Sequence, residues 1–337
     1  MSSIEEFIAG LPKAELHVHL EGSVEPETLL ELARRHRSPL ADGGGERVRE
    51  LYATRDFGAF LQAFRAVCEL LQTPEDYEFI TYKALSRLAQ QNVRYAEVTL
   101  AAGVVLWKGE NLLNSFSGME AGARRAQEDF GIRVKWIFDT VRQFGLESAE
   151  GVLREAVRLQ DRGVVGLGIG GDEQRGAPEL FRAVFDDARK QGLRLTAHAG
   201  ETAGPVSVWG ALDALGAERI SHGFTAARDP RLVAHLAARQ IPVDICLTSN
   251  VRTGCLPELA THPVRRYFNQ GLLLSLNTDD PALFETYLNR EYRLAHEVFG
   301  FSREELTRLA EASFRAAFLT PEEKESYLAA FRSPEGS

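Results

Sequence analysis

Short runs of β-branched and other apolar residues recur along the chain and alternate with stretches in which apolar residues have a helical period. This alternation is typical of a parallel α/β fold, because helices connect successive parallel strands. Eight such runs predict strands, the number that closes a (β/α)8 TIM barrel. The expected strands are residues 14–20, 93–100, 133–140, 164–169, 193–198, 219–222, 242–246 and 272–277.

The connection between the first two expected strands, residues 21–92, is much longer than the others. Its segments FGAFLQAFRAVCELL and PEDYEFITYKALSRLAQQ predict helices, and its ADGGGE segment predicts a mobile turn. An insertion after the carboxyl end of a strand lies on the catalytic side of a barrel, so this one is either a lid or a simple cover for the barrel mouth. No repeat or linker interrupts the chain, and we expect one domain over residues 1–337 with a frayed end, RSPEGS.

The composition and charge of the chain narrow its partners. Hydrophobic residues make up 44%, enough for a large core, and the net charge of −9 without a long basic run argues against a nucleic-acid binder. The start of the chain carries Glu5 and Glu6 where a signal peptide is basic, and no apolar run approaches the ~20 residues that cross a bilayer. The three cysteines form no CxxC pair, which fits a reducing compartment. We expect a cytoplasmic protein with no nucleic-acid or membrane partner, and the oligomeric state stays open.

Polar side chains gather at the carboxyl ends of four expected strands. His17 and His19 end the first strand and, as alternate residues, face the same way. His198, His222 and Asp279–Asp280 end the fifth, sixth and eighth strands. Imidazole nitrogens with one carboxylate oxygen suit Zn²⁺, so their convergence on one barrel face predicts a zinc site.

Two further features refine this predicted site. The fourth expected strand, VVGLGIGGDE, has no lysine near its end that would bridge two metals, which favours one zinc ion per chain. Glu201 follows His198 by three residues, close to the metal without being forced onto it, and this suits a proton carrier. The remaining histidines are expected to be surface or capping residues: His36, His235, His262 and His296.

Five segments between residues 12 and 281 carry a family resemblance. They are PKAELHVHLEGS, GGDE at 170–173, HAGE at 198–201, SHGF at 221–224 and SLNTDDP at 275–281. The segment DFGAFLQAFRAVCELLQTPEDY adds a helical insertion of the same kind. With these motifs in this order, the chain resembles the adenosine deaminase family of the metal-dependent amidohydrolase superfamily. The resemblance implies a zinc-dependent barrel that hydrolytically removes the amino group at C6 of an adenine-type compound.

The resemblance also implies a role for each matching residue. The implied zinc ligands are His17, His19, His198 and Asp279. Glu201 would protonate ring nitrogen N1 of the purine, and His222 would orient the attacking hydroxide and stabilise its charge. Asp280 would accept a hydrogen bond from the N7 side of the base, and the backbone amide of Gly171 would donate to N3.

The resemblance leaves the substrate open, because Glu21 stands where nucleoside-specific members carry Asp to contact the ribose 5′-hydroxyl. Glu21 is a candidate substrate-binding residue, but its extra methylene leaves the sugar contact open. The segment ICLTSNVRTG is expected to place Ser249, Asn250 and Arg252 near the rim, where Arg252 is either a solvated charge or a partner for an anionic 5′ group. Adenosine or 2′-deoxyadenosine, a 5′-extended analogue such as the aminodeoxyfutalosine of menaquinone synthesis, and free adenine all remain possible substrates. A non-catalytic purine-binding barrel is the alternative from another class.

Overall fold

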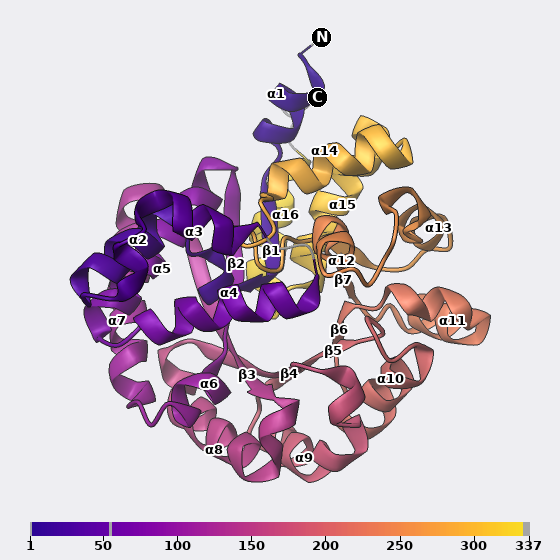
Figure 1. Cartoon of the computed structure of the whole chain (residues 1–337). Coiled ribbons are helices and arrows are strands. Elements are labelled where there is room, and N and C mark those ends of the chain that lie inside the picture. Colours follow the sequence, from indigo (N-terminus) through magenta and orange to yellow (C-terminus); the bar gives the residue numbers. More distant parts are fainter. Residues whose placement is uncertain (1, 54–55, 333–337) are drawn as a thin grey trace.

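Eight parallel strands form the centre of the molecule, here a computed structural model that describes residues 2–53 and 56–332 (Figure 1). The strands pair in chain order: β1 Lys13–His19, β2 Val93–Leu100, β3 Arg133–Val141, β4 Val164–Gly170, β5 Arg194–Ala199, β6 Arg219–His222, β7 Val243–Ile245 and β8 Leu274–Leu276. All eight predicted strands are confirmed, and so is the (β/α)8 barrel. The expected frayed end, residues 333–337, lies outside the described residues.

The barrel closes between β8 and β1 through both backbone and side-chain hydrogen bonds. Just beyond β8, the Asp279 amide donates to His17 O (3.0 Å), and the His19 amide donates to Asp279 O (2.8 Å). Asn277 Oδ1 accepts from the amides of Leu16 (2.7 Å) and His17 (3.1 Å), so a side chain takes the place of a strand partner. This seam therefore holds β1 and the segment after β8 in one register.

Helices surround the strands, so the sheet is covered on both faces and most strand residues are buried, polar ones included. The helices are α1 Ile4–Gly10, α2 Pro26–Arg35, α3 Gly44–Tyr52, α4 Phe57–Leu70, α5 Pro74–Gln90, α6 Ala102–Trp107, α7 Leu112–Phe130, α8 Gly145–Arg158, α9 Arg182–Lys190, α10 Pro205–Gly210, α11 Pro230–Arg239, α12 Leu247–Arg252, α13 Val264–Asn269, α14 Leu288–Phe299, α15 Arg303–Ala316 and α16 Pro321–Leu328. Among the described residues, no helix is long and apolar enough to span a membrane.

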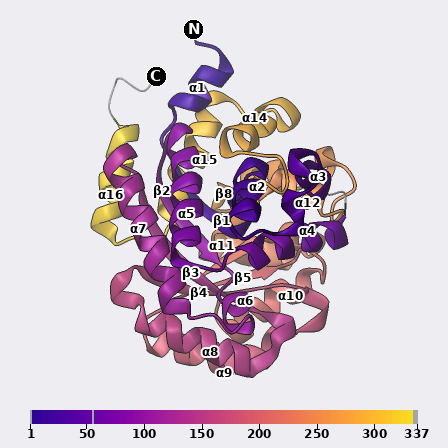
Figure 2. The ribbon, with the colours of Figure 1, turned by 60° about the vertical axis from the view of Figure 1, so that its left-hand side comes forward.

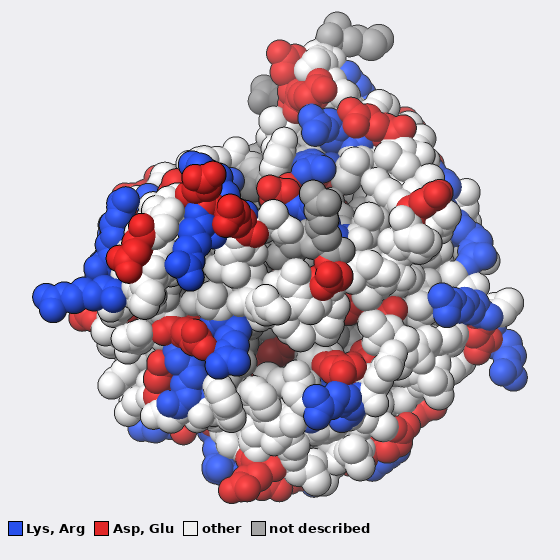
Figure 3. Space-filling model, viewed as in Figure 1, with Lys and Arg blue, Asp and Glu red and all other residues white. Residues whose placement is uncertain are grey.

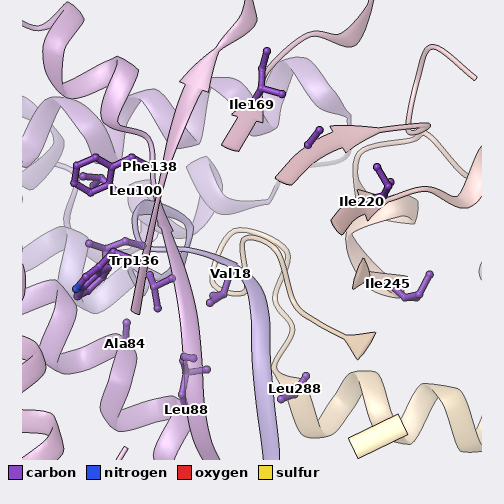
Figure 4. Packing of buried hydrophobic residues seen from close by; sticks show 14 of the residues in the cluster. Val18, Ala84, Leu88, Leu100, Trp136, Phe138, Ile169, Ile220, Ile245 and Leu288 are labelled. Carbon is purple, nitrogen blue, oxygen red and sulfur yellow. The ribbon is translucent and has the colours of Figure 1, made fainter. Parts of the chain in front are cut away.

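Aromatic packing joins the helical layer to the barrel. Phe116 of α7 meets Trp136 and Phe138 of β3 edge-on, with ring centroids 6.1 and 5.7 Å apart. Edge-to-face pairs of this kind add about 0.5–1.5 kcal/mol to the effect of their burial. Figure 4 shows Trp136 and Phe138 beside Leu100 of β2. This packing holds β2 and β3, and therefore their carboxyl ends, against the rest of the barrel.

Four helices, α2 to α5, form the insertion after β1; the sequence predicted two of them, α4 and α5, and both are confirmed. Asp56 caps α4 by accepting from the Ala59 amide (2.9 Å). In both Figures 1 and 2, α5 lies beside α7 on the outside of the barrel, whereas α4 crosses the face where the strands end. The turn expected over ADGGGE is partly wrong, because only Asp42 and Gly43 form it and α3 begins at Gly44. Gly44 has a φ of 60°, a conformation that glycine adopts without steric cost and that lets the helix begin there.

At the opposite end of the barrel, a fully buried arginine begins β6. Arg219 lies 2.7 Å from Glu97 Oε2 and 2.9 Å from Asp244 Oδ2, carboxylates of β2 and β7. Its guanidinium also donates to Leu16 O (3.2 Å). Because residues at this end of a barrel contribute to stability and the opposite end carries chemistry, we assign this ion triad to stability.

Candidate active site

Four side chains from three parts of the barrel bring one atom each to a common point. His17 and His19 project from the end of β1, His198 from β5, and Asp279 from the turn after β8. Their ligand atoms all lie within 4.8 Å of one another. The predicted ligands therefore come together although up to 262 residues of sequence separate them (279 − 17 = 262).

The spacing of these atoms fits a metal ion. His198 Nε2 lies 3.1 Å from His17 Nε2 and 3.2 Å from His19 Nε2, and Asp279 Oδ1 lies 3.1 and 3.3 Å from the same two nitrogens. Ligand bonds of about 2.0–2.1 Å in a tetrahedron put neighbouring ligand atoms roughly 3.3 Å apart. Three imidazoles and one carboxylate can therefore hold a divalent metal here.

Buried polar groups orient the metal-binding side chains from behind. Ser249 Oγ donates to Asp279 Oδ2 (2.6 Å), and His198 Nδ1 lies 3.2 Å from Ile169 O. Cys246 Sγ lies 3.6 Å from His17 Nδ1. Such second contacts fix the rotation and tautomer of metal-ligating side chains.

Asp279 and His222 have left-handed backbone conformations, which residues other than glycine rarely adopt. The φ angles are 67° for Asp279 and 66° for His222. Such conformations cost about 1–3 kcal/mol each and cluster at functional sites, where surrounding contacts hold them in place. They turn both side chains toward the centre of the barrel mouth.

The two residues predicted to act on the reacting atoms lie beside the metal-binding group. His222 Nε2 is 3.8 Å from Glu201 Oε2 and 4.0 Å from Asp279 Oδ2. Burial raises the pKa of the Glu201 carboxyl, and the neighbouring His222 only partly opposes this. A raised pKa keeps a proton available near neutral pH, as a general acid requires.

A buried glutamate that received no role from the sequence holds the loop of Glu201 in place. Glu173 accepts hydrogen bonds from the amides of Gly200 (2.6 Å), Glu201 (3.0 Å) and Ala203 (2.9 Å), and from Ser207 Oγ (2.7 Å). Burial alone would raise the pKa of Glu173, but these hydrogen bonds outweigh it and lower the pKa below its usual value. Glu173 is therefore an ionised clamp on the loop.

Replacing Glu173 by Gln is expected to lower both stability and turnover. The glutamine NH2 group would face backbone amides that are themselves donors, and an unsatisfied buried group costs about 1–3 kcal/mol. We expect the midpoint of urea unfolding to fall and kcat to drop about tenfold or more, because a loosened loop misplaces Glu201. The control is Glu179→Gln, on the exposed surface a few residues away. Unchanged stability and kcat in Glu173→Gln would contradict the clamp.

Asp139 is a second buried carboxylate that the sequence analysis missed. It lies near the carboxyl end of β3, lines the cavity, and is 3.7 Å from His198 Nδ1. A Cβ added at Gly168 or Gly170 would lie 2.0 or 2.6 Å from its carboxylate oxygens, so these glycines of β4 leave room for it. The sequence contained the information needed to find Asp139, because this residue lies near the carboxyl end of an expected strand, as the candidate histidines do.

The candidate base-binding residues also line the mouth of the barrel. Asp280 is buried, and a Cβ at Gly22 would lie 1.9 Å from its Oδ1, so only glycine fits there. Gly171 lines the cavity with a φ of 89°. Glu21 is buried behind the cavity, where its Oε1 accepts from the Ala101 amide (3.0 Å) and its Oε2 has no hydrogen-bond partner among the described residues.

The strand-seven segment and one histidine lie deeper than predicted. Ser249 and Asn250 were expected near the rim, but both are buried because α12 turns them inward beneath it. His262 was expected to be a surface or capping residue. It is only 4% exposed, so the surface alternative is wrong, whereas its Nδ1 accepts from the Val264 amide (3.1 Å) at the start of α13, a capping contact. Arg252 does lie at the surface, where it forms an ion pair with Glu285.

A cavity of about 320 Å³ opens in front of these groups. The space-filling view in Figure 3 shows a hollow in this face with acidic atoms at its floor. The cavity is polar at the metal-binding group, whereas α4 and the loops around it supply an aromatic lining. The aromatic residues are Phe57, Phe60, Phe64, Trp107, Phe144 and Phe284.

Comparison with known proteins agrees with this geometry. An aminodeoxyfutalosine deaminase from Streptomyces avermitilis is 39% identical over 340 residues, which cover 98% of this chain and 95% of that protein. The structure of an adenine deaminase from Arthrobacter aurescens is 33% identical with a TM-score of 0.90, covering 95% of this chain and 98% of that one. An amidohydrolase from Burkholderia ambifaria with bound zinc is 30% identical with a TM-score of 0.90, covering 100% and 93%.

The fold and the site define a hydrolase of the (β/α)8 barrel class with a site for a divalent metal. The sequence profile described as adenosine deaminase matches residues 12–332. The chain belongs to the adenosine deaminase family, and it is a hydrolytic deaminase that acts on a C–N bond of an adenine-type compound.

Proposed function

We propose that this chain, with one Zn²⁺ bound by His17, His19, His198 and Asp279, deaminates an adenine nucleoside that carries an extended aromatic 5′ substituent. Aminodeoxyfutalosine is such a compound, and the relative that is 39% identical to this chain is an aminodeoxyfutalosine deaminase. The observation that carries the proposal is the aromatic lining of the outer cavity, which free adenine would leave unused.

Each site residue has a part in the proposed reaction. Zinc, when bound, supplies a water whose pKa is lowered toward ~7. Glu201 gives a proton to N1 as a hydroxyl oxygen adds to C6. When the C6–N bond then breaks, the proton of the added hydroxyl passes to the amino group, which leaves as ammonia, and Glu201 regains the proton that the water lost on becoming hydroxide. His222 orients the attacking oxygen and stabilises its charge, from its place 3.8 Å from Glu201. The aromatic side chains above the site exclude water from these groups.

In this proposal Asp280 and Gly171 bind the base. The hydrogen bond between Asp280 and N7 runs in the opposite direction to the one expected from the sequence. Ring nitrogen N7 of an aminopurine carries no hydrogen, so the bond to it requires Asp280 to be protonated and to donate. Burial, and then the adjacent Asp279, raise the pKa of Asp280, which favours the protonated form. Gly171 donates its amide to N3. A contact from Glu21 Oε2 to the sugar stays a prediction.

A second candidate substrate is adenine, favoured by the 33% identity to an adenine deaminase of the same fold. Ammonia release on adenine, adenosine and aminodeoxyfutalosine separates the candidates. We expect kcat/KM to be highest for aminodeoxyfutalosine. A clear preference for adenine would overturn the substrate assignment but leave the deaminase chemistry intact.

A single substitution in the aromatic lining sharpens this comparison. Phe60 of α4 packs on Phe284, with ring centroids 5.0 Å apart, and both line the cavity. We expect Phe60→Ala to lower kcat/KM for aminodeoxyfutalosine about tenfold, because burying an aromatic group contributes about 1.5–3 kcal/mol. Activity on adenine should change little. Equal losses on both substrates would indicate that Phe60 supports the fold and not the 5′ extension.

A further inference from the structure

A chain of buried polar side chains leads away from the back of His222. His222 Nδ1 lies 3.1 Å from Asn250 Nδ2, and Asn250 Oδ1 lies 3.3 Å from His262 Nε2. The Val264 amide donates to His262 Nδ1 over 3.1 Å. All three side chains are buried, with exposed fractions of 1% for His222, 0% for Asn250 and 4% for His262. Neither Asn250 nor His262 lines the catalytic cavity, so neither is expected to contact substrate.

The direction of every hydrogen bond in this chain follows from its far end. A backbone N–H only donates, so His262 Nδ1 must be the acceptor and the neutral ring carries its hydrogen on Nε2. Burial lowers the pKa of His262 to about 3, so the ring is neutral near pH 7. The Nε2–H of His262 then donates to Asn250 Oδ1, which turns the amide NH2 group toward His222.

The last link concerns His222 itself. Because Asn250 Nδ2 is a donor, His222 Nδ1 accepts, and a neutral His222 ring carries its hydrogen on Nε2. Nε2 is the nitrogen that faces Glu201 and Asp279, at 3.8 and 4.0 Å. The ring therefore presents an N–H, and no lone pair, to the reacting atoms.

We propose that Asn250 and His262 are positioning residues that hold His222 as the Nε2–H tautomer, so that His222 acts on the attacking oxygen as a hydrogen-bond donor and not as a general base. The effect on turnover rests on the proposed function of His222. The tautomer itself does not, because it follows from the hydrogen bonds behind the ring.

The tautomer is measured directly by ¹⁵N–¹H correlation spectra of the histidine rings in the zinc-loaded protein, with the His222 signals identified by their loss in His222→Gln. We expect His222 and His262 both to be protonated at Nε2 and unprotonated at Nδ1. A His222 ring with hydrogen on Nδ1 would overturn the proposal, whatever the substrate. Absence of turnover on all aminopurines would instead contradict the proposed function, and the spectrum would still report the tautomer of His222.

One variant of Asn250 and a matched pair of His262 variants test the chain through kinetics. Asn250→Asp keeps the shape but replaces the donor to His222 by an acceptor, and we expect kcat to fall about 10²-fold with KM within about threefold, as for loss of one donor to a developing charge. His262→Phe removes the donor that orients Asn250, whereas His262→Gln retains one. We expect His262→Phe to lower kcat and His262→Gln to restore most of it. Equal kcat losses in both His262 variants, or an unshifted His222 spectrum in folded, zinc-bound Asn250→Asp, would overturn the relay.

Discussion

Glu201→Gln is expected to retain the metal and lose nearly all turnover. Glutamine has almost the same shape but cannot transfer a proton to N1, and general acid catalysis contributes about 10²–10⁴-fold. Glu201 is not among the four candidate metal ligands, and glutamine fills the same buried space, so the metal and the fold should persist. The measurements are zinc content per chain and ammonia release.

The pH dependence of the wild-type protein tests the same role. Only the protonated form of Glu201 donates, and burial raises its pKa. We therefore expect kcat/KM to fall as pH rises through that raised pKa, and this limb of the profile should be absent from the residual activity of Glu201→Gln.

The control for Glu201 is Glu285→Gln at the rim, where the carboxylate is 65% exposed and pairs with Arg252. We expect near-normal turnover and an unchanged pH profile for this variant. Near-normal turnover in Glu201→Gln itself would remove Glu201 from the mechanism.

Arg219→Leu is expected to lower the free energy of unfolding by about 3–5 kcal/mol. The reason is not the lost contacts alone. Glu97 and Asp244 would remain in the barrel interior as carboxylates without their cation, and a buried charge left unpaired is strongly destabilising. The measurement is equilibrium unfolding in urea, with the slope compared to that of the wild type.

Arg194→Leu is the matched control for Arg219. Arg194 begins the neighbouring strand β5 and pairs with Glu218, but its side chain is 45% exposed. An exposed ion pair contributes only about 0–1 kcal/mol, so a small loss is expected. Equal losses in the two variants would show that Arg219 acts through packing or strand propensity and not through the buried charges.

Much of the architecture was predictable from local pattern. Strands buried on both faces leave continuous apolar runs, and a parallel barrel sends every carboxyl end to one face. These two rules together placed His17, His19, His198, His222 and Asp279 at one site before any distance was known, and the structure brings the four metal-binding atoms within 4.8 Å.

The sequence was less informative where a residue's role depends on a distant partner. By local pattern Glu173 is only a polar residue in a loop. Its role follows from the amides of residues 200–203, which donate to its carboxylate in the folded structure. From the local pattern Asn250 was expected near the rim and His262 at the surface or at a helix cap, yet both lie buried behind His222. The ion triad of Arg219 joins β2, β6 and β7.

The sequence by itself thus determined the barrel, the side of it that gathers the polar side chains and the candidate metal-binding residues, because apolar periodicity and strand ends are local properties. Only the tertiary structure decided that Glu173 is clamped by the loop amides and how His222 is oriented. Those outcomes depend on burial and on hydrogen-bond partners far away in the chain, and no local pattern specifies which buried donor meets which acceptor.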